Sequence, residues 1–321
     1  ASDELIYLRK LSRKTWAFFE DFINEKNNYL PPDNYQVHPV EVVANRTSPT
    51  NIGIALLSHL SAVDFGYASF PGLINSMKET FKTMHKMERF RGHFYNWYDT
   101  ISLQPLNPKY ISSVDSGNLA GHLVVLKQGL LSMPDQPIIQ SEIFIGLKTT
   151  FRILQENLEE NEFSQFKFLS ETLNKAIEHH PDSLFAFHDV VKILFTEIKK
   201  VENNFQGIAH YWINKFSTQV QESIDTIKTY APWLEISDRN EIPQIPFFSK
   251  IPSWAELADA TNIIKNEIEN SYSTGDEKSI TSLPANCQEL VQKGASSTIE
   301  LLSAIQALMD DCTMFAEIEF D

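Results

Sequence analysis

The chain has 321 residues, of which 42% are hydrophobic, so it can form one large domain or two ordinary domains with a substantial core. No run approaches the ~20 apolar residues of a membrane span, so we expect no direct insertion into a membrane. The net charge of −15 is concentrated after residue 133, which argues against nucleic acid as a partner.

The two cysteines, Cys287 and Cys312, are too few for a disulfide framework and fit a reducing or an indifferent compartment. The sequence begins ASDELIYLRK, without an initiator methionine or the apolar core of a signal peptide. We therefore expect it to be part of a longer polypeptide.

Apolar residues at helical spacing predict a succession of helices separated by polar loops in the first part of the chain. The double proline Pro31-Pro32 ends the first helix, and the pair Ser48-Pro49 suits the start of the second. Alternating helices and long loops are typical of toroids of paired helices, whose sites are built from loops at one end. The predicted helices cover residues 4–26, 47–65, 71–90 and 118–131.

The stretch GHFYNWYDT, residues 92–100, combines four aromatic residues with a histidine, an amide and a carboxylate. A buried helix would be more uniformly apolar, and an exposed loop would not carry four aromatics, so the stretch is expected to line a concave site. Flat aromatic faces beside short polar groups suit a sugar ring, which offers C–H groups and hydroxyls. The alternative is an amphipathic loop that plugs one end of a helical core.

Further polar clusters lie on the loops before or after the apolar helices. Ordinary capping and turn chemistry explains each cluster alone, whereas a toroid would bring all of them to a common mouth. Together with the aromatic stretch they predict a sugar-binding site. The candidate residues are Asp33, Asn34, Arg46, Asn51, His93, Tyr95, Asn96, Trp97, Tyr98, Asp99, Asp115, Ser116 and Asn118.

Asp99 and Asp115 are the candidate catalytic residues, because two carboxyl groups can act as acid and base across a glycosidic bond. Each has a rival role: Asp99 could cap the loop after Tyr98, and Asp115 could cap the helix that begins near Ser116. We expect both to orient sugar hydroxyls rather than to transfer protons. No histidine spacing supports a metal site, so neither a metal nor another cofactor is expected.

From about residue 138 the composition changes, since glycine becomes rare and charge rises. Helical periodicity continues to residue 316, interrupted by a proline-rich connection at 232–252. Runs of alternating strand residues are confined to short stretches, so the predicted fold class is all-α. The predicted division is a motif-bearing part at 1–135 and an acidic helical region at 136–321 whose outer face is solvated.

Four long stretches follow one another along the chain: NYLPPDNYQ (28–36), ANRTSPTNIGIALLS (44–58), GHFYNWYDT (92–100) and KYISSVDSGNLAGHLVVL (109–126). In this order they resemble the glycoamylase-like segment of bacterial cyclic β-1,2-glucan synthases. The resemblance covers about residues 15–130 and implies that residues 1–135 form the front part of an (α/α)6 toroid.

In that family the toroid cleaves and cyclises β-1,2-glucan by retaining transglycosylation, within a large enzyme that also holds a membrane-embedded glycosyltransferase. The resemblance implies a cytoplasmic location for this chain, as a soluble part of such a bacterial inner-membrane enzyme. The family's glutamate-bearing motifs have no match here. The chain alone is therefore expected to lack the catalytic acid and nucleophile.

These expectations lead to a primary hypothesis and to alternatives of a different class. The chain would supply sugar-binding loops to a β-1,2-glucan transglycosylase or hydrolase domain. Alternatively, it is a non-catalytic carbohydrate-binding module or a helical scaffold that binds another protein. The expected partners are a β-glucan oligosaccharide or polysaccharide and either the remainder of a larger synthase chain or another copy of this chain.

Overall fold

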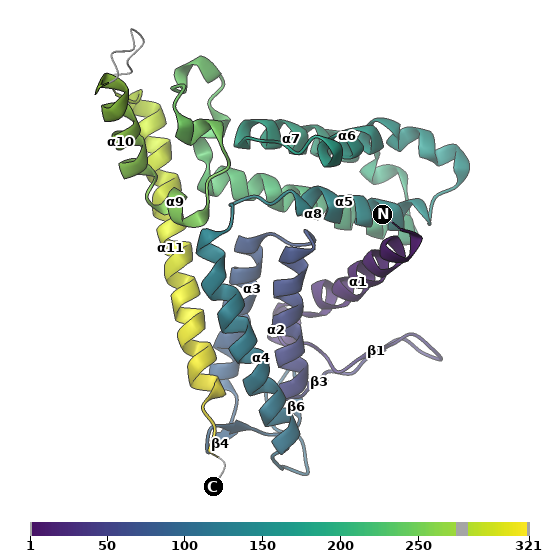
Figure 1. The fold of residues 1–321 in the computed structure, drawn as a ribbon. Helices are drawn as coiled ribbons and strands as arrows, with labels where there is room; N and C mark the ends of the chain where they lie inside the picture. Colours follow the sequence, from purple (N-terminus) through teal and green to yellow (C-terminus); the bar gives the residue numbers. More distant parts are fainter. Residues whose placement is uncertain (1, 274–281, 320–321) are drawn as a thin grey trace. The chain divides into compact units, whose positions relative to one another are not determined.

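A computed structural model describes residues 2–273 and 282–319 (Figure 1). The described residues are mainly helical, so the all-α class predicted from the sequence is confirmed. None of the helices in these two ranges is long and apolar enough to cross a membrane. The helices are α1 (Asp3–Phe22), α2 (Pro49–Asp64), α3 (Phe70–Lys86), α4 (Ser113–Ser132), α5 (Glu142–Gln155), α6 (Lys167–Glu178), α7 (Leu184–Val201), α8 (Gly207–Tyr230), α9 (Trp254–Ala258), α10 (Ala260–Ser273) and α11 (Ala285–Ala316).

The strands are short and occur in antiparallel pairs between the helices. Since each strand has two residues, the pairs fix loops and build no sheet layer. β1 (Tyr35–Gln36) pairs with β2 (Val42–Val43), β3 (Arg46–Thr47) pairs with β6 (Tyr98–Asp99), and β4 (Arg89–Phe90) pairs with β5 (His93–Phe94).

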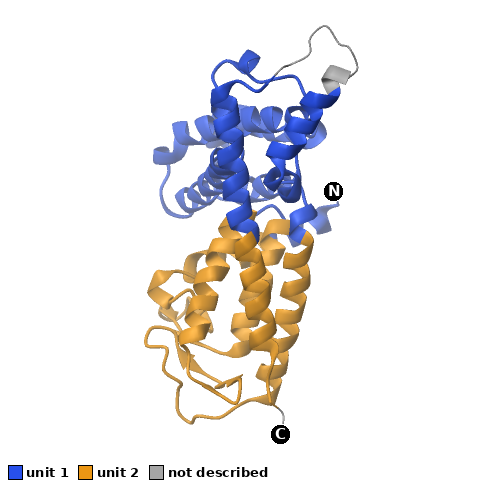
Figure 2. Ribbon diagram, turned by 90° about the vertical axis from the view of Figure 1, so that its left-hand side faces the viewer, with its two compact units in different colours: residues 1–10, 65–69, 133–302 blue, residues 11–64, 70–132, 303–321 orange. Residues whose placement is uncertain are grey.

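The chain divides into two compact units, each assembled from several segments (Figure 2). The predicted division into residues 1–135 and 136–321 stays a prediction, as does the acidic outer face of the second part. Unit 1 comprises residues 1–10, 65–69 and 133–302, and unit 2 comprises residues 11–64, 70–132 and 303–321.

In unit 2, helices α2 and α4 pack closely because each presents a glycine to a side chain of the other. A Cβ atom on Gly53 would lie 2.3 Å from Nδ1 of His122, and a Cβ atom on Gly129 would lie 2.3 Å from a methyl group of Leu60. Gly53 and His122 have the same separation in the sequence as Leu60 and Gly129, so the helices run parallel. Their N-termini therefore lie at the same end of the unit.

The capping residues of these two helices follow ordinary rules. Ser48 Oγ accepts a hydrogen bond from the backbone N–H of Asn51 at 3.2 Å, with Pro49 as the first helical residue. Ser112 Oγ accepts one from the backbone N–H of Asp115 at 3.2 Å. Since Ser112 already caps α4, the carboxylate of Asp115 is directed to other partners.

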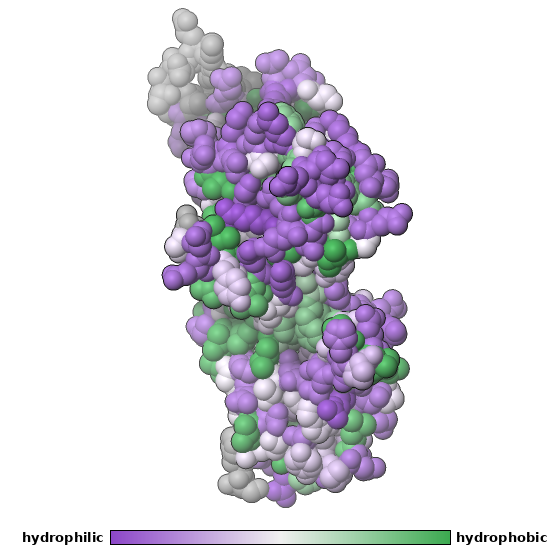
Figure 3. Space-filling model, turned by 90° about the vertical axis from the view of Figure 1, so that its right-hand side faces the viewer, coloured by the Kyte–Doolittle hydropathy of each residue, from purple (hydrophilic) through white to green (hydrophobic). Residues whose placement is uncertain are grey.

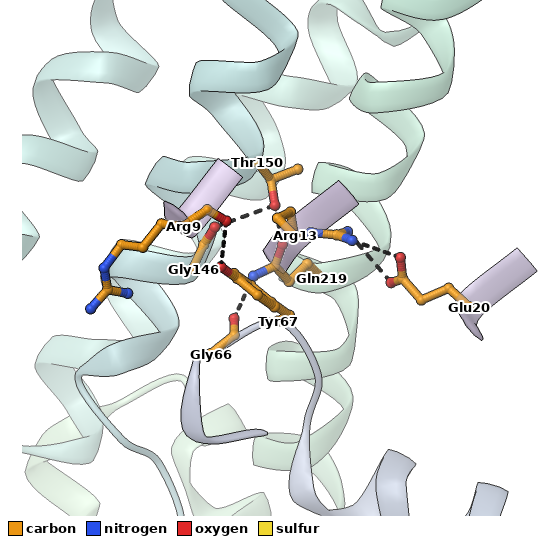
Figure 4. A network of polar contacts seen from close by, with 8 residues as sticks. All are labelled: Arg9, Arg13, Glu20, Gly66, Tyr67, Gly146, Thr150 and Gln219. Atoms are coloured by element: carbon orange, nitrogen blue, oxygen red, sulfur yellow. Dashed lines mark hydrogen bonds and ion pairs between the residues drawn. The ribbon is translucent and has the colours of Figure 1, made fainter. Parts of the chain in front are cut away.

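In unit 1, a buried glutamine fastens residues 65–69 to helices α5 and α8 (Figure 4). The side-chain amide of Gln219 on α8 donates to the carbonyl oxygen of Gly66, and its oxygen accepts from Oγ1 of Thr150 on α5 at 2.9 Å. Gly146 on α5 lies so close that a Cβ atom there would be 2.1 Å from the same carbonyl oxygen. Position 146 therefore requires glycine.

Helix α1 carries a partly buried ion pair within unit 2, which Figure 4 also shows. The Arg13 side chain is fully buried, and its Nη1 lies 2.8 Å from Oε2 of Glu20 two turns further along the helix. A buried guanidinium without a carboxylate would be strongly destabilising, so this pair fixes which face of α1 packs inward.

Helix α4 exposes an apolar strip to solvent. Its only charged residues are Asp115 and Lys127, and both side chains are hydrogen bonded within unit 2. Hydrophobic side chains also reach the surface among hydrophilic ones on the face shown in Figure 3. A helix with so few charged residues is ordinarily covered by other parts of the protein on most sides. The exposed hydrophobic residues of α4 are Val114, Val124, Val125 and Leu131.

The contact at Gly146 predicts a large effect of one added methyl group. Gly146→Ala should lower the free energy of unfolding by about 1–3 kcal/mol, because the neighbouring backbone carbonyl cannot move aside as a flexible side chain would. Urea denaturation would measure the change. Gly121→Ala is the matched control, since a Cβ atom there has nothing within 4 Å and gains helix propensity. Equal stability of the two variants would contradict the prediction.

Candidate functional site

The GHFYNWYDT stretch is a loop of unit 2 held by a strand pair near each end. At its start, His93 and Phe94 pair with β4; at its end, Tyr98 and Asp99 pair with β3. The middle of the loop is further fixed by a hydrogen bond from the N–H of Asn96 to the carbonyl oxygen of Tyr110 at 2.9 Å. The positions of the intervening side chains are thereby set by backbone pairing.

Asn96 is the central side chain of the candidate site and is buried. Its partners assign the amide orientation: Oδ1 accepts from the Tyr110 hydroxyl at 2.5 Å and from Nε1–H of Trp97 at 2.7 Å, and Nδ2 donates to Oδ2 of Asp115 at 2.9 Å. One amide therefore connects the aromatic loop to the first turn of α4. It also fixes the plane of the Trp97 indole ring.

On one side of Trp97 lies a cationic and acidic pair from the loop before α2. The guanidinium carbon of Arg46 is 4.9 Å from the centroid of the Trp97 ring, a cation–π contact. Arg46 Nε and Nη2 both donate to Oδ2 of Asp33, at 3.1 and 2.9 Å. Asn34 and Asn51 donate to the same carboxylate, at 3.1 and 3.4 Å. Half of the Arg46 side chain remains exposed, at 52%.

Beyond Asn96 lies the Asp115 carboxylate, which is anchored at both oxygens. Oδ1 accepts from the Thr50 hydroxyl at 2.6 Å, and Oδ2 accepts from Asn96. Asn118 Nδ2 in turn donates to the Thr50 hydroxyl at 3.1 Å. These bonds join the first turns of α2 and α4. They position Asp115 as an oriented acceptor rather than as a helix cap.

The remaining residues of the stretch hold the loop in place. Tyr98 is fully buried; its hydroxyl donates to the carbonyl oxygen of Glu88 at 2.5 Å and accepts from the N–H of Tyr95 at 2.7 Å. Burial raises the pKa of the Tyr98 hydroxyl well above its usual range. The Tyr95 ring faces the Nζ of Lys109, 5.4 Å from the ring centroid.

Asp99 closes the turn that follows the aromatic stretch. Its Oδ1 accepts from the backbone N–H of Ile101 at 3.0 Å and from the N–H and hydroxyl of Ser102 at 2.7 and 2.9 Å. These bonds, led by the one from the Ser102 backbone, lower the pKa of the Asp99 carboxyl. One oxygen of this carboxylate is thus occupied by its own loop.

His93 and Ser116 lie behind the network. His93 is buried, its Nδ1 is 2.8 Å from Oγ of Ser116, and its Nε2 is 2.6 Å from the carbonyl oxygen of Glu319. A carbonyl oxygen can only accept, so Nε2 carries the proton and the Ser116 hydroxyl donates to Nδ1. Both ring nitrogens are therefore engaged with the protein itself.

The structure thus brings many of the predicted residues into one hydrogen-bonded and stacked cluster. Two members were not among the sequence-predicted residues, Thr50 and Tyr110; both lie inside the motif stretches, which was the available signal. Within residues 2–273 and 282–319, no group of three or more histidine, cysteine or carboxylate side chains is placed to hold a metal ion. The cluster consists of Asp33, Asn34, Arg46, Thr50, Asn51, Asn96, Trp97, Tyr110, Asp115 and Asn118, and the pair Ser116 and His93 lies next to it.

The cluster, which we call the Trp97 site, combines one flat indole ring with oriented amides and carboxylates. Trp97 is partly exposed, unlike the fully buried Tyr98 beside it. Carboxylate and amide oxygens accept hydrogen bonds from hydroxyl groups, and Arg46 donates them. Such a surface can stack an apolar ring face and bind hydroxyls at the ring edge.

The chain was compared with protein-family models and with solved structures. No protein-family model matches the chain. Solved structures of glucoamylase-like proteins from Bacteroides caccae ATCC 43185 and Bacteroides fragilis NCTC 9343 match with TM-scores of 0.32, 13% and 11% identity, and 98% or more of both chains covered. A TM-score this low supports no argument about the fold, so the (α/α)6 toroid stays a prediction.

The sequence comparison is more informative. Over 155 residues, 48% of this chain, the sequence is 44% identical to the cyclic beta-(1,2)-glucan synthase NdvB of Rhizobium meliloti strain 1021. The match spans 5% of that relative's length. The predicted resemblance to cyclic β-1,2-glucan synthases is therefore confirmed over about half of this chain.

Proposed function

We propose that this chain is part of a carbohydrate-active domain and that the Trp97 site binds β-1,2-linked glucan. The observation that carries the proposal is the Trp97 ring, held by Asn96 and backed by Arg46, with oriented carboxylates on either side. A ring fixed in advance loses little conformational freedom on binding. The 44% identity to a cyclic β-1,2-glucan synthase supports the choice of glucan.

Within the site we assign different roles to the two candidate carboxylates. Asp115 orients sugar hydroxyls, because both of its oxygens are already directed by Thr50 and Asn96. Asp99 supports the loop and transfers no proton, because its Oδ1 accepts three bonds from its own turn. The catalytic acid and nucleophile of a retaining reaction would come from residues outside this chain. The chain alone should therefore bind glucan without cleaving it.

Replacing the indole ring tests the binding site directly. Trp97→Ala should weaken binding of β-1,2-glucooligosaccharides by about 1–3 kcal/mol, the usual contribution of a stacked aromatic ring. Isothermal titration calorimetry would measure the affinity, and a thermal melt would report the fold. Trp97→Phe is the matched variant, since it keeps a smaller flat ring and loses the bond to Asn96. It should recover part of the affinity that Trp97→Ala loses.

Two outcomes separate the roles of this tryptophan, and a third tests the proposed linkage. Weaker binding with an unchanged melt supports the stacking role. A fold destabilised by about 3–5 kcal/mol, with unchanged affinity in the folded fraction, would make Trp97 a core residue and refute the site. A wild-type chain that binds β-1,2-linked and β-1,4-linked oligosaccharides equally would contradict the proposed linkage.

The pH dependence of stability tests the structural role of Asp99. Its folded pKa lies below the unfolded value, so its contribution is present above the ordinary pKa of 3.8 and is lost as pH falls through the folded pKa. Asp99→Asn should therefore be less stable than the wild type near neutral pH, and the difference should shrink as pH drops below that value. Urea unfolding at several pH values would measure this. A pH-independent difference would contradict the assigned role.

A further inference from the structure

Residues 317–319, which follow α11, lie directly against the start of the aromatic loop in unit 2. The N–H of Glu319 donates to the carbonyl oxygen of Arg91 at 3.4 Å, and Nε2–H of His93 donates to the carbonyl oxygen of Glu319 at 2.6 Å. Glu319 is thus joined to the start of the loop by one backbone hydrogen bond and by one from a side chain.

A glycine makes this approach possible. Gly92 has a φ of +81°, and a Cβ atom there would lie 2.9 Å from the carbonyl oxygen of Glu317 and 3.4 Å from Cα of Ile318. An alanine would therefore meet backbone atoms rather than a flexible side chain, in addition to the strain of a positive φ. The close contact and the unusual backbone conformation occur at the same residue.

The end of α11 supports the contact with a cluster of rings. The Phe315 ring is 5.6 Å from the ring of Phe94 and 5.9 Å from the ring of Phe81 on α3, and the guanidinium carbon of Arg89 is 4.8 Å above it. Phe315 is buried. The end of α11, directly before residues 317–319, is therefore anchored by packing that includes Phe94 of the aromatic loop.

His93 links this segment to the Trp97 site. Its Nδ1 accepts from the hydroxyl of Ser116, the residue next to Asp115, and Asp115 holds Asn96, which in turn holds Trp97. We propose that His93 is a positioning residue: with residues 317–319 it fixes the aromatic loop against the first turn of α4, and so sets the geometry of the glucan site. This inference rests on the proposed function for its ligand and on the contacts above for its mechanism.

Two variants break the contact in different ways, in the full chain. His93→Ala removes both hydrogen bonds, and Gly92→Ala pushes residues 317–319 away. Hydrogen–deuterium exchange of amides 93–99 should rise about tenfold in both, and the dissociation constant for β-1,2-glucooligosaccharides should rise about tenfold, as expected when a buried hydrogen bond is lost. Thermal melts of both variants give the fraction of each that is folded, so that exchange and affinity are compared for folded protein.

Two control variants distinguish a loss of loop positioning from a general destabilisation of the fold. Gly207→Ala is matched to Gly92→Ala, since Gly207 also has a positive φ, +60°, but a Cβ atom there has nothing within 4 Å. It should leave exchange of 93–99 and glucan affinity unchanged. His93→Gln keeps a donor that can reach the carbonyl oxygen of Glu319, so it should restore much of the protection that His93→Ala loses.

The inference would be overturned if amides 93–99 exchanged at the wild-type rate in both His93→Ala and Gly92→Ala. It would also be overturned if these amides exchanged faster while the affinity for glucan stayed unchanged. A wild-type chain that fails to bind glucan would refute the proposed function instead. The exchange measurement, which needs no sugar, would then still decide whether residues 317–319 fix the loop. The two failures are therefore distinguishable.

Discussion

The parallel packing of α2 on α4 is the constraint on which the candidate site depends. Gly53 and Gly129 allow the helix backbones to approach, one making room for His122 and the other for Leu60. Because the helices run in the same direction, the loops that precede them end beside each other. Residues far apart in the sequence, such as Thr50 and Asp115, can then form a hydrogen bond of 2.6 Å. A larger residue at Gly53, one turn from Thr50, would meet the His122 ring and press on the two helices close to these ends.

Around that junction the polar side chains form a network in which one group orients the next. Asn96 has an acceptor that binds two donors and a donor that binds a carboxylate, so its buried amide is satisfied on both ends. Burial strengthens such bonds and makes an unpaired member costly, which favours a single arrangement. On the indole ring of Trp97, Arg46 makes a cation–π contact and is itself oriented by hydrogen bonds to Asp33. Short-range bonds thus fix the polar side chains of the site on the packed ends of α2 and α4.

Much of the architecture could be predicted because it follows from local sequence. The predicted helix at 4–26 corresponds to α1 at Asp3–Phe22, and the pair Ser48-Pro49 begins α2 as expected. Capping and periodicity act over a few residues, so a sequence alone carries them. The alternative role considered for Asp99, closing the turn after Tyr98, is also local, and the geometry matches it.

The orientation of side chains within the aromatic loop could not be predicted in this way. Tyr98 is buried and Trp97 is partly exposed because β6 pairs with β3, whose partner residue Thr47 lies about fifty positions earlier in the chain. Likewise Asp115 is free of capping only because Ser112 accepts the bond that the helix start requires. Nothing in GHFYNWYDT alone distinguishes these arrangements, since each depends on a distant partner. The contact of His93 with Glu319 is a further example.

The exposed apolar strip of α4 has a consequence for the behaviour of the chain in solution. Exposed valines and a leucine at this surface favour association between molecules, and electrostatic repulsion between like-charged molecules opposes it. That repulsion comes from the net charge of −15 and vanishes near the isoelectric point of about 5.0. Colloidal stability should therefore be greatest in mildly alkaline buffers of low ionic strength, and salt should promote association even though it leaves the fold intact.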